Sequence, residues 1–377
     1  MPRRKKWYLF IVPLVLAVIV SGPFLWWYAL PVRPLQVIIL DKTVPDRTYR
    51  EHRGLMWILN HRKRFNRNTG KPFRYDRDYY GFFPLEGKSF DIISLPSDLK
   101  KADMVYIADT YGVYSEDFYG ENLPGERSEL LYGGMTEEEA AAVAAAARAG
   151  VLTVAEFNTL ASPTPEGARK KMEEVFGVEF TGWTGRYFSD LSATNKEMPE
   201  WLVASYERQE GKKWRYTGPG LVLVHAGGRV VVLAEGREVE TPPCAAMVRR
   251  PWPRGPEVGK KIPYYYWFEI LRPKKGSEVW AEFQINATAE GKKILAHNGI
   301  PASFPAVVAV TDRPVYYLAG DFADLAEVPP RWSVAGMSWV QRLFGTALPG
   351  DQTYFYWHFY FPLVDFFLEK IGDGGRR

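Results

Sequence analysis

Apolar runs along the chain end in acidic residues that could perform acid–base chemistry or bind a ligand. The runs ending at Asp41, Asp109 and Glu156 have the composition of buried strands, and a further run leads to Asp321. In an open parallel sheet, ligands bind beyond the carboxyl ends of the strands, so these side chains are expected at one edge. A buried glutamate is costly unless it is paired or used in chemistry. Glu156 and Asp321 are therefore the predicted catalytic acid and base, if the protein is an enzyme.

Polar and aromatic residues are predicted to surround these carboxylates. Lys42 and Arg186 are candidate cationic partners of Glu156, because arginine binds a carboxylate through two parallel hydrogen bonds. Aromatic side chains near Arg186 would form a wall suited to a sugar or a peptide-like envelope fragment. Asp, Asn and Thr also cap helices and form turns, so a purely structural role stays open. The predicted ligand-binding residues are Lys42, Asp109, Tyr111, Asn158, Trp183 and Arg186.

Cysteine, histidine and glycine patterns exclude several other chemistries. Cys244 is the single cysteine, so the chain has no intrachain disulfide and no cysteine cluster for zinc or iron–sulfur. The five histidines lack the spacings of zinc ligands, and no glycine-rich nucleotide-binding motif or GxSxG elbow occurs. We therefore expect no metal site and no cofactor. The segment from Arg50 to Arg53 either lies over the strand ends or is a solvated helix face.

The elements that must position these residues alternate between strands and helices. Thr136 and Glu139 form a capping box that predicts the start of a helix, and Gly150 predicts its end. A second helix is predicted between Thr164-Pro165 and Gly177. Strands that alternate with helices imply an α/β fold, a parallel sheet with helices on both faces.

The pattern changes after about residue 200 to strands and turns. "GLVLVHAGGRVVVLAEG" predicts a hairpin about Gly227-Gly228, and "PYYYWFEI" and "SEVWAEFQI" are strand-like. The aromatic segment that begins at Tyr354 is predicted to be a helix docked on the domain, with a membrane-surface helix as the alternative. We predict a basic tail at 1–6, a transmembrane helix at 7–30, an α/β domain at 31–202 and 301–377, and a β-rich insert at 203–300.

The first thirty residues predict a single-pass membrane anchor. Residues 7–30 carry no charge in 24 positions, and as a helix they would span roughly 36 Å, enough for a hydrocarbon core of about 30 Å. Aromatic residues at both ends match the membrane interfaces. A cleaved signal peptide is the alternative, although Ser21-Gly22-Pro23 is a poor cleavage site.

Charge predicts the orientation of this anchor. The chain has 48 Lys and Arg against 44 Asp and Glu, and the basic residues from Arg3 to Lys6 account for the excess. By the positive-inside rule the N-terminus is cytoplasmic and the bulk of the chain extracytoplasmic. The remaining sequence is neutral, so we expect no nucleic-acid partner.

One stretch of the chain resembles the class I glutamine amidotransferase-like superfamily. The resemblance rests on "GGMTEEEAAAVAAAARAGVLTVAEFNT" and the closing "VYYLAGDFAD", and it covers roughly residues 35–200 and 300–370. It implies a flavodoxin-like fold. In amidotransferases the turn after the strand carries a nucleophilic cysteine between glycines, but here residues 155–159 contain no thiol. The resemblance therefore implies a non-amidotransferase member without glutaminase activity.

These observations leave two main hypotheses for function. The leading one is a membrane-anchored domain of the cell envelope that binds a glycan, another envelope-related ligand or an envelope protein. The alternative is a carboxylate-based hydrolase that acts on a glycan or cell-surface polymer. Two carboxylates in an open cleft, one of them in an apolar setting, would favour the hydrolase. A third interpretation makes the β-rich insert an interaction surface.

Overall fold

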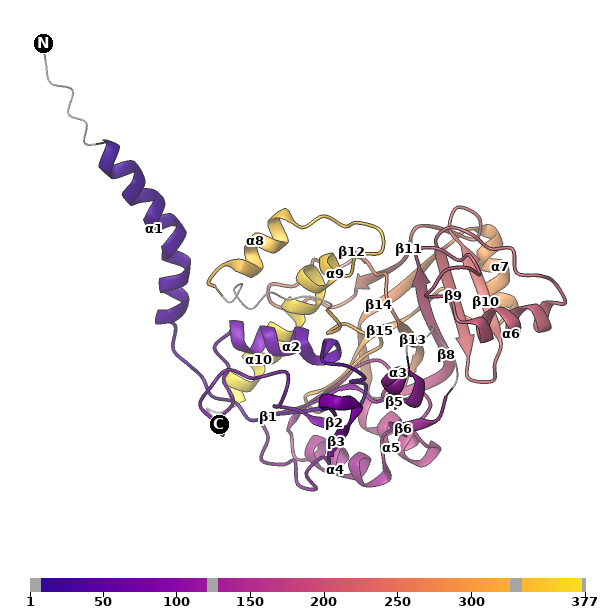
Figure 1. Ribbon diagram of the computed structural model, residues 1–377, viewed down its shortest axis with the longest axis horizontal. Helices are drawn as coiled ribbons and strands as arrows, with labels where there is room; N and C mark the ends of the chain where they lie inside the picture. Colours follow the sequence, from indigo (N-terminus) through magenta and orange to yellow (C-terminus); the bar gives the residue numbers. More distant parts are fainter. Residues whose placement is uncertain (1–7, 121–127, 326–333, 375–377) are drawn as a thin grey trace, which may run out of the picture.

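The computed structural model describes residues 8–120, 128–325 and 334–374, and it has a mixed α/β architecture (Figure 1). Its centre is a ten-stranded sheet, accompanied by a four-stranded and a two-stranded sheet. In order across the large sheet, the strands are β12 (Lys261–Pro263), β11 (Val239–Val248), β14 (Ser277–Ala287), β15 (Ser303–Val310), β16 (Val315–Leu318), β7 (Leu152–Ala155), β4 (Met104–Asp109), β1 (Val37–Asp41), β2 (Tyr80–Pro84) and β3 (Phe90–Ile93).

The large sheet is parallel only at its centre. Strands β16, β7, β4, β1 and β2 pair in parallel, and the flanking strands pair antiparallel. The predicted parallel sheet is therefore present only in these five strands, and the sheet as a whole is mixed. A short connection, such as the one from β15 to β16, cannot cross over to a parallel neighbour. The predicted strand ends at Asp41 and Asp109 are confirmed.

Strands of the predicted β-rich segment are divided between two sheets. Strands β11, β12 and β14 extend the large sheet. The four-stranded sheet has the order β10 (Val230–Ala234), β9 (Gly220–His225), β8 (Val178–Phe188) and β13 (Phe268–Pro273). The predicted hairpin is confirmed, because β9 and β10 pair antiparallel on either side of Gly227 and Gly228. The limits of the insert at 203 and 300 stay a prediction.

Local sequence signals place the helices beside the sheet. Helix α4 (Glu137–Arg148) begins with the predicted capping box of Thr136 and Glu139. Helix α5 (Glu166–Phe176) ends at Gly177, whose left-handed backbone suits glycine. The remaining described elements are α2 (Arg50–His61), η1 (Glu86–Lys88), β5 (Val113–Tyr114), α3 (Ser115–Tyr119), β6 (Leu130–Tyr132), α6 (Glu200–Glu210), α7 (Ala289–His297) and α8 (Met337–Phe344).

The aromatic C-terminal segment packs into the core, as the docking hypothesis predicts. It comprises α9 (Thr353–Phe355), the π-helical turn η3 (Tyr356–Tyr360) and α10 (Phe361–Gly374). Phe355 and Tyr360 are fully buried, and the Phe355 ring lies 4.8 Å from the ring centroids of both Tyr264 and Phe322. Rings at this separation add attraction beyond the burial of their area. The segment thereby fixes the loop that follows β16.

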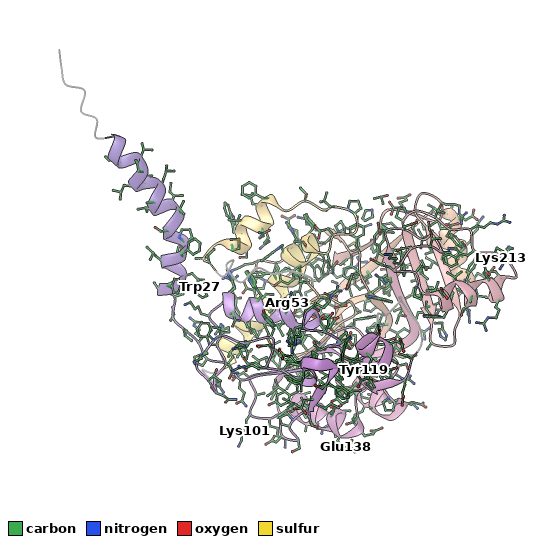
Figure 2. All side chains as sticks on the ribbon, viewed as in Figure 1. Trp27, Arg53, Lys101, Tyr119, Glu138 and Lys213 are labelled. Atoms are coloured by element: carbon green, nitrogen blue, oxygen red, sulfur yellow. The ribbon has the colours of Figure 1, made fainter. Side chains whose placement is uncertain are left out.

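Helix α1 (Tyr8–Ala29) extends away from the rest of the protein, and its side chains from Ile11 to Ser21 are exposed (Figure 2). Within the described residues it is the one helix long and apolar enough to cross a membrane, from Ile11 to Ala29. At its base the indole Nε1 of Trp27 donates a hydrogen bond to the carbonyl of His61 at 2.9 Å. The ammonium of Lys63 lies 3.8 Å from the centroid of the Trp27 ring. These contacts join the apolar helix to α2 of the α/β domain.

Candidate functional site at the strand ends

The end of β1 is joined to α2 by a buried pair of side chains. Asp41 accepts a hydrogen bond from Nδ1 of His52 at 2.5 Å, and Nε2 of His52 lies 2.8 Å from the carbonyl oxygen of Tyr75. Both residues of the pair are buried. Because His52 is in the first turn of α2, this contact holds the start of that helix over the strand ends. The segment from Arg50 to Arg53 is therefore not a solvated helix face.

Asp109 lies at the end of β4 and is buried among donors. Its Oδ1 accepts from Oγ1 of Thr43 and from the backbone N–H of Tyr111, each at 2.5 Å, and its Oδ2 accepts from the amide of Asn158 at 3.0 Å. Burial raises the pKa of Asp109 to about 7, although these hydrogen bonds favour the ionised form. The predicted proximity of Asp109 and Asn158 is thus present in the structure.

Glu156 follows β7 and is the most buried acidic residue among the predicted site residues, with 1% of its surface exposed. The Tyr106 hydroxyl donates to one carboxylate oxygen. The other oxygen accepts from the backbone N–H groups of Phe322 and Ala323 at 2.8 and 3.1 Å. Burial raises the pKa of Glu156 to about 8. With both oxygens bonded inside the protein, Glu156 holds the loop after β16 against β7.

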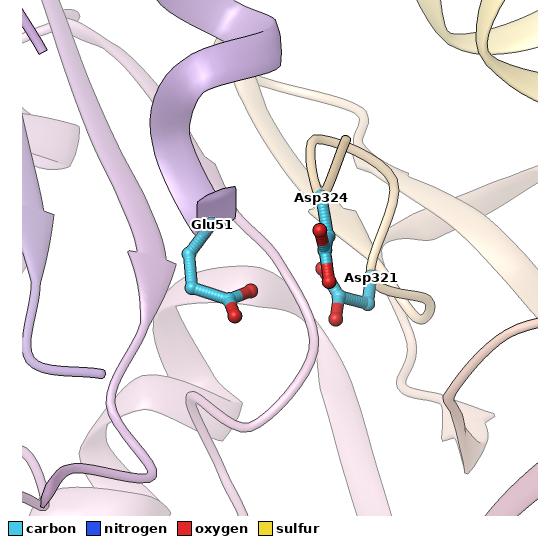
Figure 3. A group of neighbouring side chains, drawn as sticks. All are labelled: Glu51, Asp321 and Asp324. Atoms are coloured by element: carbon cyan, nitrogen blue, oxygen red, sulfur yellow. The ribbon is translucent and has the colours of Figure 1, made fainter. Parts of the chain in front are cut away.

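Three further carboxylates, those of Glu51, Asp321 and Asp324, lie close together near the loop that Glu156 binds (Figure 3). Glu51 comes from the first turn of α2, and Asp321 and Asp324 come from the loop after β16. One oxygen of each lies within 4.8 Å of the others. Asp324 is 4% exposed and is paired with Arg50, whose nitrogens lie 2.7 and 2.8 Å from its two oxygens. The hydroxyl of Tyr266 also donates to Asp324, at 2.5 Å.

Glu51 and Asp321 differ from Asp324 because their carboxylates lack such partners. Across the described residues, neither side chain accepts a hydrogen bond or forms an ion pair, and Oε2 of Glu51 is buried. Asp321 is only 7% exposed. Burial raises the pKa of both groups well above the ordinary range, and the neighbouring carboxylates raise it further. If all three carboxylates were ionised, the cluster would carry three negative charges beside the single positive charge of Arg50.

The predicted cationic partners of Glu156 bind elsewhere. Nζ of Lys42 donates to the carbonyl of Gly134 at 2.8 Å and to Glu139 at 2.7 Å, so it supports the start of α4. Burial lowers the pKa of Lys42, and Glu139 opposes this effect. Arg186 pairs with Glu197 at 2.5 Å. Among the described residues Glu156 thus has backbone and hydroxyl partners in place of a cation.

The rings of the predicted aromatic residues contact other aromatic side chains. Trp183 is buried in β8, with its ring centroid 5.0 Å from that of His225. Tyr111 is exposed and packs against Tyr114 at 5.0 Å. The guanidinium of Arg186 lies 5.1 Å from the centroid of Trp267. Because the "TGWTGRYF" segment forms a strand of the second sheet, Trp183 and Tyr187 face one side of it and Arg186 faces the other, so the arginine does not lie within an aromatic wall made by these two rings.

A buried glutamate that sequence reasoning missed supports the turn after β7. Glu269 of β13 accepts from the Tyr317 hydroxyl at 2.5 Å and from the backbone N–H of Asn158 at 3.2 Å. Burial raises the pKa of Glu269 to about 8. The signal was a lone acidic residue within the aromatic run "PYYYWFEI". Glu51 and Asp324 were visible as neighbours of helix-start and strand-end signals, but no role was assigned to them.

The turn after β7 has an asparagine, Asn158, at its left-handed backbone position. Asn158 has a left-handed backbone, with φ of 64°. Such conformations are uncommon outside glycine and concentrate at functional sites.

The single thiol of the chain lies far from this turn. Cys244 is buried in β11, which β14, β15 and β16 separate from β7 in the sheet. Burial raises the pKa of the Cys244 thiol, so the thiolate is disfavoured.

Comparisons with known proteins give no family assignment. A scan against protein-family models finds no match, and a search of curated proteins finds no significant relative. The features of this chain that bear on function are the strand-end carboxylates, the turn at Asn158 and the apolar helix α1.

Proposed function

We propose that the protein is a membrane-anchored, extracytoplasmic, amidotransferase-like domain that binds an envelope-related ligand or partner without glutaminase activity. The observation that carries this proposal is that two carboxylates at the carboxyl edge of the parallel strands, those of Glu51 and Asp321, have no hydrogen-bond or ion-pair partner among the described residues. This edge is the ligand-binding position of open α/β sheets. Buried carboxylates without partners destabilise a fold, so their presence supports a binding role.

The order of the parallel strands supports a flavodoxin-like assignment. From one side to the other the strands run β2, β1, β4, β7 and β16. Numbered by their sequence order among the parallel strands, this arrangement is 2-1-3-4-5, which is the flavodoxin-like order. The order of strands changes direction at β1, beside which β4 ends in Asp109. This agreement supports the resemblance on which the proposal depends.

The turn after β7 supports the absence of glutaminase chemistry. Thiol catalysis needs a reactive cysteine at this turn, and the left-handed position is occupied by Asn158. The Asn158 amide donates to Asp109, and its backbone N–H donates to Glu269. An amide held in this way positions neighbouring carboxylates and supplies no nucleophile. We accordingly expect no hydrolysis of glutamine.

Binding is tested with the full chain in neutral detergent. Soluble peptidoglycan fragments and cell-surface oligosaccharides are titrated into wild type, Asp321→Asn and the control Asp312→Asn, and binding is followed by calorimetry. Asp312 is exposed at the opposite end of β16 and pairs with its neighbour Arg313, so it is a matched control. We expect binding by wild type and the control and its loss in Asp321→Asn. Binding that Asp321→Asn leaves unchanged would contradict the proposed site.

The alternative is a carboxylate-based hydrolase acting on a glycan or cell-surface polymer. The short separation of the carboxylates in the Glu51 cluster favours it, since retaining glycosidases place their two carboxyl groups about 5 Å apart. Asp321 would supply one carboxylate. Glu156, the other residue predicted from sequence, has both oxygens bonded to the protein, so Glu51 is better placed as the partner.

This alternative is tested on the same samples by the release of reducing ends from the polymers. Turnover that Asp312→Asn retains and that both Asp321→Asn and Glu51→Gln abolish would favour the hydrolase. Loss of turnover in Glu156→Gln alone, with unfolding monitored by circular dichroism, would restore Glu156 as the catalytic group. Binding without turnover in wild type leaves the proposed binding function in place.

A further inference from the structure

We propose that Glu51, Asp321 and Asp324 form a binding site for a hard divalent cation such as Ca²⁺. The ligands would be carboxylate oxygens from the start of α2 and from the loop after β16 (Figure 3). The spacing of histidine and cysteine, from which no metal site was expected, concerns nitrogen and sulfur ligands. It has no bearing on a site made of oxygen, which suits Ca²⁺, Mg²⁺ and Mn²⁺.

The distances fit one ion. An oxygen from each carboxylate lies within 4.8 Å of the other two. Ca²⁺ binds oxygens at about 2.3–2.6 Å, so ligands on opposite sides of the ion are about 5 Å apart. Mg²⁺ requires distances of about 2.1 Å and stricter octahedral geometry, which carboxylates from two separate segments meet less readily than the flexible geometry of Ca²⁺. The side chains need little movement to coordinate it.

Unsatisfied oxygens give the second, independent reason. Asp321 is 7% exposed, and no hydrogen bond or ion pair joins its carboxylate to another described residue. Oε2 of Glu51 is buried without a hydrogen-bond partner. Figure 3 shows its side chain directed toward the carboxylate of Glu51. Burying such groups without compensation is costly. A divalent cation would satisfy both carboxylates at once, whereas without it protons must neutralise them.

The surroundings hold the ligands in position. Glu156 accepts hydrogen bonds from the backbone of Phe322 and Ala323, which lie between Asp321 and Asp324 in the sequence. His52, the residue after Glu51, is hydrogen-bonded to Asp41. Arg50 and Tyr266 fix the orientation of Asp324. Each carboxylate oxygen has two lone-pair directions, so Asp324 can keep these partners and still bind a cation. Such outer contacts raise metal affinity by orienting the ligands.

The test measures cation binding directly and uses no organic ligand, so its failure is separate from failure of the proposed function. The full chain in neutral detergent is treated with EDTA, dialysed and titrated with CaCl₂, MgCl₂ and MnCl₂ by calorimetry, with Mn²⁺ electron paramagnetic resonance as a second measurement. We expect saturable binding by wild type and Asp312→Asn, with Ca²⁺ bound more tightly than Mg²⁺.

The variants Asp321→Asn and Glu51→Gln should each raise the apparent Kd for Ca²⁺ at least about tenfold. Both substitutions remove a buried negative charge and preserve shape, so the variants are expected to fold, which circular dichroism checks. The proposal is overturned if wild type binds none of the three cations in the millimolar range. It is also overturned if both variants bind them as wild type does.

A different observation carries a second inference, which rests on the proposed membrane anchoring by α1. Helix α8 exposes a row of large apolar side chains: Trp339 and Phe344 are 65% and 73% exposed, and Val340 and Leu343 are exposed as well. Just before α8, the backbone N–H of Ala335 donates to the carbonyl of Pro23 at 3.3 Å. Pro23 lies within the apolar span of α1.

We infer that α8 lies in the headgroup region of the bilayer that α1 crosses. Pro23 is six residues before Ala29, the end of α1, which corresponds to about 9 Å along the helix axis. Interfacial helices bury their apolar face to about 5–10 Å, so the contact places α8 at a matching depth. The exposed tryptophan is the residue type enriched at membrane interfaces.

Lipid contact is tested by fluorescence in phosphatidylcholine liposomes that contain the full chain. An environment-sensitive label is attached to Leu343→Cys or, as a control, to Lys213→Cys, an exposed position far from α1 (Figure 2). Cys244 is buried and should stay unlabelled. Quenching by lipids with a nitroxide near the headgroup is expected at position 343 alone. Equal quenching at both positions, in liposomes shown by flotation to carry the protein, overturns the inference.

Discussion

At the scale of single residues, Glu156 illustrates how a buried acid can serve structure. It accepts hydrogen bonds from Tyr106 and from two backbone N–H groups, in a position closed to solvent. A carboxylate that has its partners inside the protein joins segments, whereas one without partners is available to a ligand. This distinction separates Glu156 from Asp321, although the sequence presents both as acids at strand ends.

Removing the Glu156 carboxylate should destabilise the protein strongly. Glu156→Ala leaves the N–H groups of Phe322 and Ala323 and the hydroxyl of Tyr106 without an acceptor in a buried site. We expect the free energy of unfolding to fall by about 3 kcal/mol or more. Urea unfolding of the full chain in detergent measures it. In Glu166→Ala, which removes an exposed pair with Lys170, the loss should stay below about 1 kcal/mol; equal losses would contradict the structural role.

Glu269 predicts a pH dependence of stability. Its pKa is about 8 in the folded protein, above its ordinary value of 4.5, so the folded state retains a proton that the unfolded state releases between these values. Stability therefore decreases as the pH rises through this window. Asp109 and Glu156, with pKa values of about 7 and 8, act in the same direction.

The test is denaturant unfolding of wild type and Glu269→Gln from about pH 5 to pH 8. Gln keeps the shape of the side chain but cannot titrate, so the slope of stability against pH should become less steep by at most about 1.4 kcal/mol per pH unit. The remaining slope should reflect the other buried acids. An identical slope in both proteins would show that Glu269 does not bind the proton.

At the scale of elements, the start of α4 combines a helix cap with a buried ion pair. Thr136 accepts from the backbone N–H of Glu139, and the Glu139 carboxylate binds both the Thr136 N–H and Lys42. Thr136→Ala should lower the free energy of unfolding by about 1 kcal/mol. Thr194→Ala, in an exposed turn, is the control and should change it little. Similar values for the two variants, measured by urea unfolding, would exclude a capping contribution.

Local sequence signals predicted the strands, helices and turns better than they predicted which strands pair with each other. The apolar runs before Asp41 and Asp109, the capping box at Thr136 and the turn at Gly227-Gly228 each depend on a few adjacent residues, and each is present in the structure. The antiparallel flank of the large sheet was not predicted, because pairing between distant strands leaves no local signature. The "TGWTGRYF" segment was assigned to the site, yet its alternation fits a strand of another sheet.

The sequence placed the candidate site at the strand ends, but it did not select all of the residues that lie there. Reading the strand ends selected Asp109, Glu156 and Asp321, which do lie at the carboxyl edge. Glu51 was not selected because it belongs to a helix start, and only the tertiary contact of α2 with β1 brings it there. Lys42 was misassigned because the sequence cannot tell which of two nearby acids a lysine side chain faces.

At the scale of the whole molecule, the apolar helix α1 predicts integral membrane association. Its side chains are exposed over the span from Ile11 to Ala29, so in water they would present a large apolar surface. Extraction of membranes with alkaline carbonate or high salt should leave the full chain in the pellet, as detected by immunoblot. Release of the protein by either treatment would contradict the anchor. Solubilisation by neutral detergent is the positive control.

The contacts at the base of α1 restrict how the domain can move above a membrane. Trp27 is bonded to the backbone of α2 and covered by Lys63, and α2 in turn carries Glu51. With α1 in a bilayer, as proposed, the strand-end site would be held at a set height and tilt, whereas a long flexible tether would let it move over a wider area. A ligand on the same bilayer would be sought by diffusion in two dimensions, at a raised local concentration. Ligands that are fixed farther from the surface would lie beyond the reach of the site.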